Sequence, residues 1–210
     1  YTPLTTTAGT LYYYVIVSGT CAPPVTSTVS GSVTVNTAPA LTVQPSSATQ
    51  TICLNGSATA LSVTATGAGL TYQWYSNTTN SNSGGSLISG ATSLTYTPLT
   101  TTAGTLYYYV IVNGTCTPPV TSTVSGSVTI NTAPAITVQP SSATQTICLN
   151  DAATQLSVTA TGPGLTYQWY SNTTNSNSGG SLISGATSSA YTPLTSTAGT
   201  LYYYVVVSGT

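Results

Sequence analysis

Four cysteines could form disulfides in this chain, and they occupy two positions of a repeat. Cys21 and Cys116 are 95 residues apart, as are Cys53 and Cys148 (116 − 21 = 148 − 53 = 95). Cys53 and Cys116 fit one disulfide per domain in an oxidising, extracellular setting, which would stabilise the fold by about 4 kcal/mol. Two buried free thiols and a bridge between domains are the alternatives. Cys21 and Cys148 would pair with residues outside the chain.

Side chains for catalysis or metal binding are almost absent. The chain has no Lys, Arg or His, and Asp151 is its single acidic residue. Acid–base catalysis needs a group that titrates near the working pH, and a Ser or Cys nucleophile needs a base. Zinc and calcium sites need carboxylates, imidazoles or thiolate clusters, and nucleic acid attracts cationic residues. We therefore expect no enzyme, no catalytic or metal-binding residues, no cofactor and no nucleic-acid partner.

The remaining composition is typical of β-strands. Hydrophobic residues make up 40% of the chain, which has 16 Tyr and many β-branched residues, whereas disordered chains lack such residues. The longest apolar run, residues 106–112, is far shorter than the about 20 residues of a membrane-spanning helix. The sequence therefore predicts a folded β-protein without membrane insertion in this segment.

The sequence repeats with a period as long as a small domain. Tyr1-Thr2-Pro3-Leu4 recurs from Tyr96 and again from Tyr191 (96 − 1 = 191 − 96 = 95). Such a period exceeds that of solenoid repeats and matches a tandem array of domains. Pro-containing segments after alternating runs are the natural joints. We expect the C-terminal part of one repeat at 1–37, a complete repeat at 38–132 and most of the next at 133–210.

Within residues 38–132, apolar residues alternate with polar ones, and no segment shows helical spacing. About seven short strands separated by turn signals predict a β-sandwich. Asn113-Gly114 is a hairpin signal. Residues 77–85 read as a polar loop or a weak edge hairpin. The expected strands cover residues 41–43, 61–65, 70–75, 87–88, 94–98, 105–112 and 120–130.

Three segments resemble an immunoglobulin-type domain: Cys53, then Tyr72-Gln73-Trp74-Tyr75, then the run from Ala103 to Tyr109. Trp74 stands where such domains place a core Trp on strand C, and Ala-Gly-Thr-x-Tyr resembles the turn into strand F. The second cysteine lies beyond Asn113-Gly114 instead of inside strand F. The bond would therefore tie the start of strand B to the F–G end of the sandwich.

The fuller resemblance is to bacterial immunoglobulin-like repeats of giant secreted cell-surface proteins of the Bacteroidetes, of adhesin or gliding type. It rests on Cys-Leu-Asn-Gly, Tyr-Gln-Trp-Tyr, Gly-Ala-Thr, Tyr-Tyr-Tyr-Val and Gly-Thr-Cys, and it covers every copy in the chain. The resemblance implies type IX secretion, attachment to the cell surface, and adhesion or gliding.

Strand alternation separates an expected core from possible contact residues. We expect Trp74 and Trp169 in the core rather than on a sugar-binding platform, since alternation groups Trp74 with its apolar neighbours. Successive tyrosines of one strand cannot all face the core. They could pack under loops or line a neighbouring domain, a second fibre or a glycan. The other expected core residues are Leu61, Val63, Leu70 and Tyr72, and the possible contact aromatics are Tyr75, Tyr107 and Tyr109.

These observations favour a structural role. We expect a rod segment of an extracellular, cell-surface-attached filament or giant adhesin, which spaces a tip from the cell. A self-assembling multi-chain fibre or sheath and, after it, a carbohydrate-binding repeat are the alternatives. The expected partners are neighbouring repeats of the same chain, other copies of the filament, and glycans attached to the abundant Ser and Thr.

Overall fold

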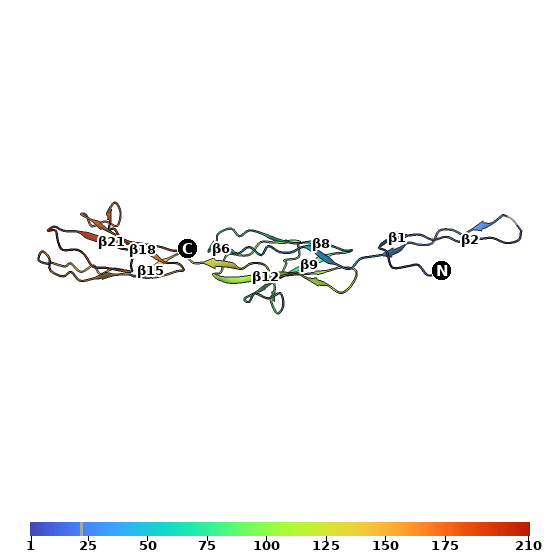
Figure 1. Cartoon of the computed structure of the whole chain (residues 1–210), viewed down its shortest axis with the longest axis horizontal. Coiled ribbons are helices and arrows are strands. Elements are labelled where there is room, and N and C mark those ends of the chain that lie inside the picture. The colour runs from blue at the N-terminus through green and yellow to red at the C-terminus, as the bar shows by residue number, and fades with distance from the viewer. Residues whose placement is uncertain (22) are drawn as a thin grey trace. The chain divides into compact units, whose positions relative to one another are not determined.

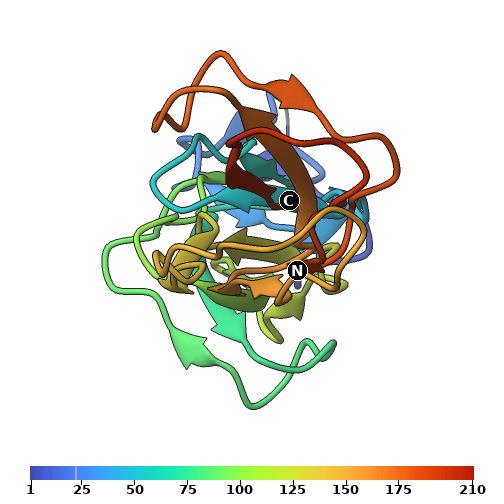
Figure 2. The same cartoon turned by 90° about the vertical axis from the view of Figure 1, so that its left-hand side faces the viewer.

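The protein consists of β-strands joined by turns and loops, and the computed structural model describes residues 1–21 and 23–210 (Figure 1). No helix occurs along these described residues, and the view along the other direction shows the same strands and loops (Figure 2). The predicted all-β class is thus confirmed. The described residues form two compact units, and the predicted repeat boundaries, which rest on the sequence period, stay a prediction.

The strands are short, and most have two to four residues. Residues 1–37 hold β1 (Gly9–Leu11), β2 (Ile16–Val17), β3 (Val25–Thr26) and β4 (Val33–Val35). Residues 38–132 hold β5 (Ala40–Val43), β6 (Gln50–Cys53), β7 (Leu61–Ser62), β8 (Thr64–Thr66), β9 (Thr71–Asn77), β10 (Ser86–Leu87), β11 (Thr95–Tyr96), β12 (Gly104–Asn113), β13 (Val120–Thr121) and β14 (Val128–Asn131). Residues 133–210 hold β15 (Ala135–Val138), β16 (Leu156–Ser157), β17 (Thr159–Thr161), β18 (Thr166–Asn172), β19 (Ser181–Leu182), β20 (Ala190–Tyr191) and β21 (Tyr202–Ser208).

The first compact unit comprises Tyr1–Gln50, Ala58–Pro98 and Thr105–Val128. In it, β9 pairs antiparallel with β10 on one side and with β12 on the other, and β12 also pairs with β13. A second layer contains the antiparallel pairs β5–β8 and β7–β11. Two antiparallel layers that enclose one apolar core form an immunoglobulin-like β-sandwich, as the sequence predicts.

Side-chain alternation along β9 and β12 builds the core of this sandwich. Trp74 lies opposite Val110 and Tyr72 lies opposite Val112 in the register of the two strands, so their side chains share one face. Trp74, Val110 and Val112 are fully buried. The opposite face carries Tyr75, which lies opposite Tyr109.

Aromatic rings connect the two layers. Tyr96, on β11, lies 6.0 Å from the ring of Trp74 and 5.4 Å from the ring of Tyr108, measured between ring centroids. These distances are within the range of favourable tilted aromatic pairs. The Nε1–H of Trp74 donates to the carbonyl of Ser93 at 2.9 Å, so the buried indole has a polar partner.

The second compact unit comprises Thr51–Ser57, Leu99–Gly104 and Thr129–Thr210. Its strands repeat the pattern, with β18 between β19 and β21 and with the pairs β15–β17 and β16–β20. The core contains Leu156, Val158 and Trp169, against which Tyr191 and Tyr203 pack. Trp169 donates to the carbonyl of Ser188 at 2.9 Å, the counterpart of the Trp74 bond.

Two predicted strands, at residues 61–65 and 120–130, are each divided in the structure, the first into β7 and β8. The sequence favours one strand over residues 120–130, but the structure divides this stretch into β13 and β14. Between these strands, the hydroxyls of Ser122 and Ser125 accept hydrogen bonds from the backbone N–H groups of Val110 and Tyr108, both at 3.0 Å. A side-chain oxygen thus replaces the backbone carbonyl as the partner of β12, and the regular ladder is interrupted.

The sequence analysis did not predict β6. Gln50 N donates to Ser127 O at 2.8 Å, and Leu54 N donates to Asn131 O at 2.7 Å. Donor and acceptor positions advance together along both segments, so β6 and β14 run in the same direction. Parallel pairing of segments so far apart in sequence leaves little local signal.

Candidate functional site

The predicted disulfide is not formed: Cys53 and Cys116 are free thiols in the structure. Cys116 follows β12, is half-buried, and its Sγ lies 3.5 Å from the carbonyl oxygen of Asn36, in the segment before the complete repeat. Cys53 ends β6 and is exposed, and its neighbour Leu54 donates to Asn131, at the end of the same repeat. Each cysteine thus lies beside a different joint, which is why the two do not meet.

Cys21 and Cys148 are exposed free thiols as well. Cys148 opens a turn in which its carbonyl accepts a bond from Asp151 N at 3.0 Å, matching the Cys53 carbonyl and Gly56 N at 2.8 Å. The pairing of Cys21 and Cys148 with residues outside the chain stays a prediction.

The structure places the two tryptophans in the interior. Trp74 and Trp169 both have 0% of their surface exposed. Leu61 and Val63 are buried too, while Leu70 and Tyr72 are half-buried at the ends of the core. Neither indole can stack on a sugar from solvent without opening the sandwich.

The tyrosines predicted as contact residues make mostly intramolecular contacts. Tyr75 and Tyr109 stack with centroids 5.1 Å apart and an interplanar angle of 6°. The hydroxyl of Tyr109 accepts a bond from Gly85 N at 3.1 Å, and this loop covers the ring, which is 3% exposed. Tyr75 and Tyr107 are half-buried. The structure thus gives Tyr109 an intramolecular role and leaves part of Tyr75 and Tyr107 in contact with solvent.

The first residues of each repeat pack closely against turns of the same repeat, a contact that sequence reasoning missed. Pro39 is buried, and a Cβ added at Gly67 would lie 3.0 Å from its Cα. A Cβ added at Gly114 would lie 3.3 Å from the Cδ of the same proline. A larger side chain at either position would therefore crowd the proline ring. The recurrence of both glycines with each Pro was the sequence signal.

The second joint has the same construction. A Cβ added at Gly162 would lie 3.0 Å from the Cα of Pro134, and one added at Gly209 would lie 3.5 Å from its Cδ. The side chain of Asn131 donates to the carbonyl of Thr210 at 3.1 Å. The residues before Pro39 and Pro134 thus contact the loops that carry Cys116 and Thr210, respectively.

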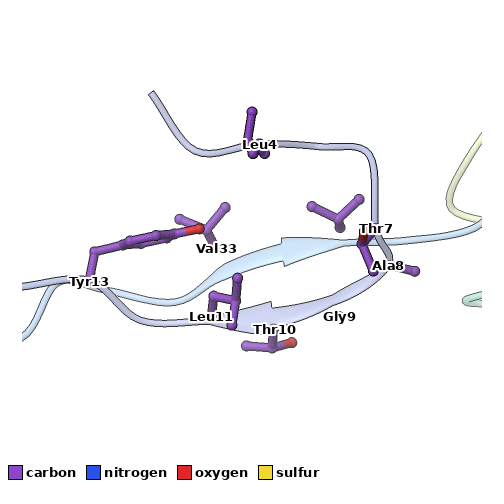
Figure 3. Close-up of a pocket in the computed structure, with 9 residues that line it drawn as sticks. Leu4, Thr7, Ala8, Gly9, Thr10, Leu11, Tyr13 and Val33 are labelled. Atoms are coloured by element: carbon purple, nitrogen blue, oxygen red, sulfur yellow. The ribbon is translucent and has the colours of Figure 1, made fainter. Parts of the chain in front are cut away.

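An open hollow of about 160 Å³ lies on residues 4–35 (Figure 3). Leu4, Leu11, Tyr13 and Val33 are among the residues that line it. The residues 95 positions later that correspond to Tyr13 and Val33 are Tyr108 and Val128, both buried in the complete repeat. The hollow is therefore the core face of a sandwich and not a ligand pocket.

Polar side chains in the interior have hydrogen-bond partners. No buried side-chain N or O atom lacks a hydrogen-bond partner among the described residues. These residues also contain no group of three or more His, Cys, Asp or Glu that could hold a metal ion.

Burial, and secondarily the phenol of Tyr96, raises the pKa of Tyr108 to about 12. No helix in the described part of the chain is long and apolar enough to cross a membrane.

Comparison with protein families gives one match, the family described as Domain of unknown function (DUF8696), over residues 44–133 and 137–210. The chain belongs to the DUF8696 family. The two matched ranges start 93 residues apart (137 − 44 = 93), close to the 95-residue period, so successive matches fall on successive repeats. No curated protein matches the chain.

Solved structures similar to this DUF8696 chain include fragments of several domains in tandem. Sidekick-1 immunoglobulin domains 1–4 match with 21% identity and a TM-score of 0.41, over 80% of this chain and 45% of that one. The titin I-band fragment I67–I69 matches with 14% identity and a TM-score of 0.46, over 71% and 50%. Domains 3–5 of Drosophila OTK match with 13% identity and a TM-score of 0.34, over 99% and 72%. The chain spans half or less of the Sidekick-1 and titin fragments.

Proposed function

We propose that this chain is a rod segment of an extracellular surface filament or giant adhesin, in which tandem domains hold a tip away from the cell. The observation that supports it most is the joint that recurs with one geometry. A Cβ added at the two glycines beside Pro39 would lie 3.0 and 3.3 Å from the proline, and one added at the two glycines beside Pro134 would lie 3.0 and 3.5 Å from it. Proline fixes the backbone at the start of each repeat, and a chain of domains in series extends in proportion to its repeat number.

The chemistry of the surface supports the same role. With one acidic residue and no Lys, Arg or His, the chain lacks groups for acid–base catalysis and for nucleic-acid binding. It therefore acts without catalysis or cofactor, and its partners are neighbouring repeats, other filament copies, and glycans attached to exposed Ser and Thr. The protein works outside the cell, attached to its surface.

Electron microscopy of the native filament tests this proposal. We expect a single beaded strand whose bead number grows with the number of repeats. Small-angle scattering of chains with two, three and four repeats should show a maximum dimension that rises linearly. Laterally fused sheets, or a dimension that stops rising, would contradict the rod.

A multi-chain fibre is the second candidate, because the same apolar residues are exposed in successive repeats. Leu87 and Leu182 are 57% and 58% exposed, and Leu99 and Leu194 are 71% and 76% exposed. Leucines that are exposed in each repeat could contact another chain. The aromatic strand β12 offers no open edge for this contact at Ile111 and Val112, since it pairs there with both β9 and β13. Lateral association would therefore use side chains rather than strand addition.

A further inference from the structure

The free cysteines lie where successive repeats meet, and this position suggests a pairing that differs from one disulfide per domain. Asn36 and Asn131 are the same position in two successive repeats, 95 residues apart (131 − 36 = 95). Both stand just before a joint proline. The contacts of these two residues show what surrounds the joint.

One side of the joint carries a cysteine of the following repeat. The Sγ of Cys116 lies 3.5 Å from the carbonyl oxygen of Asn36. Its loop is fixed in place, because Thr115 N donates to Ala68 O at 2.8 Å, and a Cβ added at Gly69 would lie 2.5 Å from Thr115 Oγ1. The cysteine is thus held against the joint.

The other side carries a cysteine of the preceding repeat. Leu54 N donates to the carbonyl oxygen of Asn131 at 2.7 Å, and Cys53 is the residue directly before Leu54. Cys53 is exposed, at the end of β6. The carbonyl of the junction asparagine is therefore the common neighbour of both cysteine positions.

In the next repeat, the loop that carries Thr210 has the same contacts as the loop that carries Thr115. Thr210 N donates to Pro163 O at 3.1 Å, and a Cβ added at Gly164 would lie 2.7 Å from Thr210 Oγ1. These are the contacts of Thr115, repeated. Gly19-Thr20 and Gly114-Thr115 are each followed by Cys, so where the array continues, the period places a cysteine directly after Thr210 and beside Asn131.

We propose that each joint is closed by a disulfide between repeats, which links the Cys53 position of one repeat to the Cys116 position of the next. Every cysteine is then used once, and each repeat is bonded to both neighbours. Within residues 1–210, no two cysteines meet this rule, in agreement with their four free thiols. The inference does not depend on the rod function, since it concerns only the chemistry of the joint.

Bond formation is an oxidation and needs an acceptor. The two thiols lose two protons and two electrons, and one S–S bond forms. A small-molecule or protein disulfide accepts them through thiol–disulfide exchange, and its own S–S bond breaks to give two thiols. Oxidised glutathione is the acceptor in the experiment.

The test compares the 210-residue chain with the same chain extended by a single cysteine after Thr210. The extended chain offers the bond between repeats, Cys53 to residue 211, and two bonds within repeats, Cys53–Cys116 and Cys148 to residue 211. After oxidation, a chymotryptic digest is analysed by non-reducing mass spectrometry. We expect the peptide containing Cys53 to be linked to residue 211 and the free thiols to fall from five to three.

Matched variants separate this link from chance oxidation. Cys53→Ser in the extended chain should abolish the link, whereas Cys116→Ser and Cys148→Ser should retain it. The unextended chain should keep four thiols under the same conditions. A Cys53–Cys116 peptide, a Cys148 peptide linked to residue 211, or no linked peptide at all would overturn the proposal.

Discussion

The hydroxyl of Ser122 accepts a hydrogen bond from the backbone N–H of Val110 at 3.0 Å, while Ser122 N donates to Val110 O at 2.9 Å. One residue thus satisfies both backbone groups of Val110, which is fully buried. Ser125 does the same for Tyr108. Ser27 and Ser30 repeat the arrangement in the preceding copy, where they bond to Val15 and Tyr13.

Ser122→Ala should destabilise the protein by about 1–3 kcal/mol, since the substitution leaves a buried N–H without an acceptor. Equilibrium urea unfolding followed by tryptophan fluorescence measures the change. The exposed Ser62→Ala in β7 is the control and should change the free energy of unfolding by less than about 0.5 kcal/mol. An equal effect of the two variants would show that the Ser122 hydroxyl is dispensable.

Gly126→Ala should destabilise the protein by at least about 2 kcal/mol, because a Cβ at this position would overlap the backbone carbonyl of Ala48. The exposed Ser62→Ala again serves as the control and should leave the urea midpoint nearly unchanged. A similar loss in both variants would contradict the steric explanation.

Stability should fall between about pH 10 and pH 12. The pKa of Tyr108 is raised from 10.0 to about 12 in the folded protein, chiefly by burial. In this interval the unfolded chain releases the Tyr108 proton while the folded chain keeps it, so the free energy of unfolding decreases as pH rises. Below about pH 10 both states hold the proton, and this contribution is constant.

Tyr108→Phe removes this contribution and should flatten the decrease. Urea unfolding at pH 9 and at pH 11.5 measures it for the variant and the unchanged protein. If both lose the same free energy between the two pH values, the buried phenol is not the cause.

Trp74→Phe should cost about 1–3 kcal/mol, since it leaves a cavity and removes the donor to the Ser93 carbonyl. Trp169→Phe should behave alike, because its surroundings are the same. Both indoles are fully buried, so acrylamide should quench native tryptophan fluorescence weakly and unfolded fluorescence strongly. Strong quenching of the native protein would contradict the buried position.

Some strands were predictable from the sequence, and others were not. Alternation and aromatic content predicted residues 105–112, and β12 covers Gly104–Asn113. β6 was not predicted, because Gln50-Thr51-Ile52-Cys53 is short and largely polar and because its partner strand, β14, is distant in sequence. The hydrogen bonds of Ser122 and Ser125 to β12 were not predicted, because period-two spacing cannot reveal a hydroxyl that takes the place of a backbone carbonyl.

The cysteines show a second limit. Spacing indicated that Cys53 and Cys116 belong to one repeat, but spacing does not say which end of a sandwich a residue occupies. That position depends on β6, which runs parallel to β14, and on the loop after β12. The sequence contains Gly67, Gly114 and Pro39, but these residues are far apart along the chain. Their contact arises only when the chain folds, so their role could not be predicted.

The shared direction of β6 and β14 has a mechanical consequence. The bonds Gln50 N to Ser127 O and Leu54 N to Asn131 O lie across the strand direction. Tension along the strands would pull β6 and β14 past each other in shear, so these hydrogen bonds would be loaded simultaneously. A force that separates the two strands from one end would instead break the bonds one by one. If the proposed rod function holds, this pairing would let a repeat resist a pull along the chain with only a few backbone contacts.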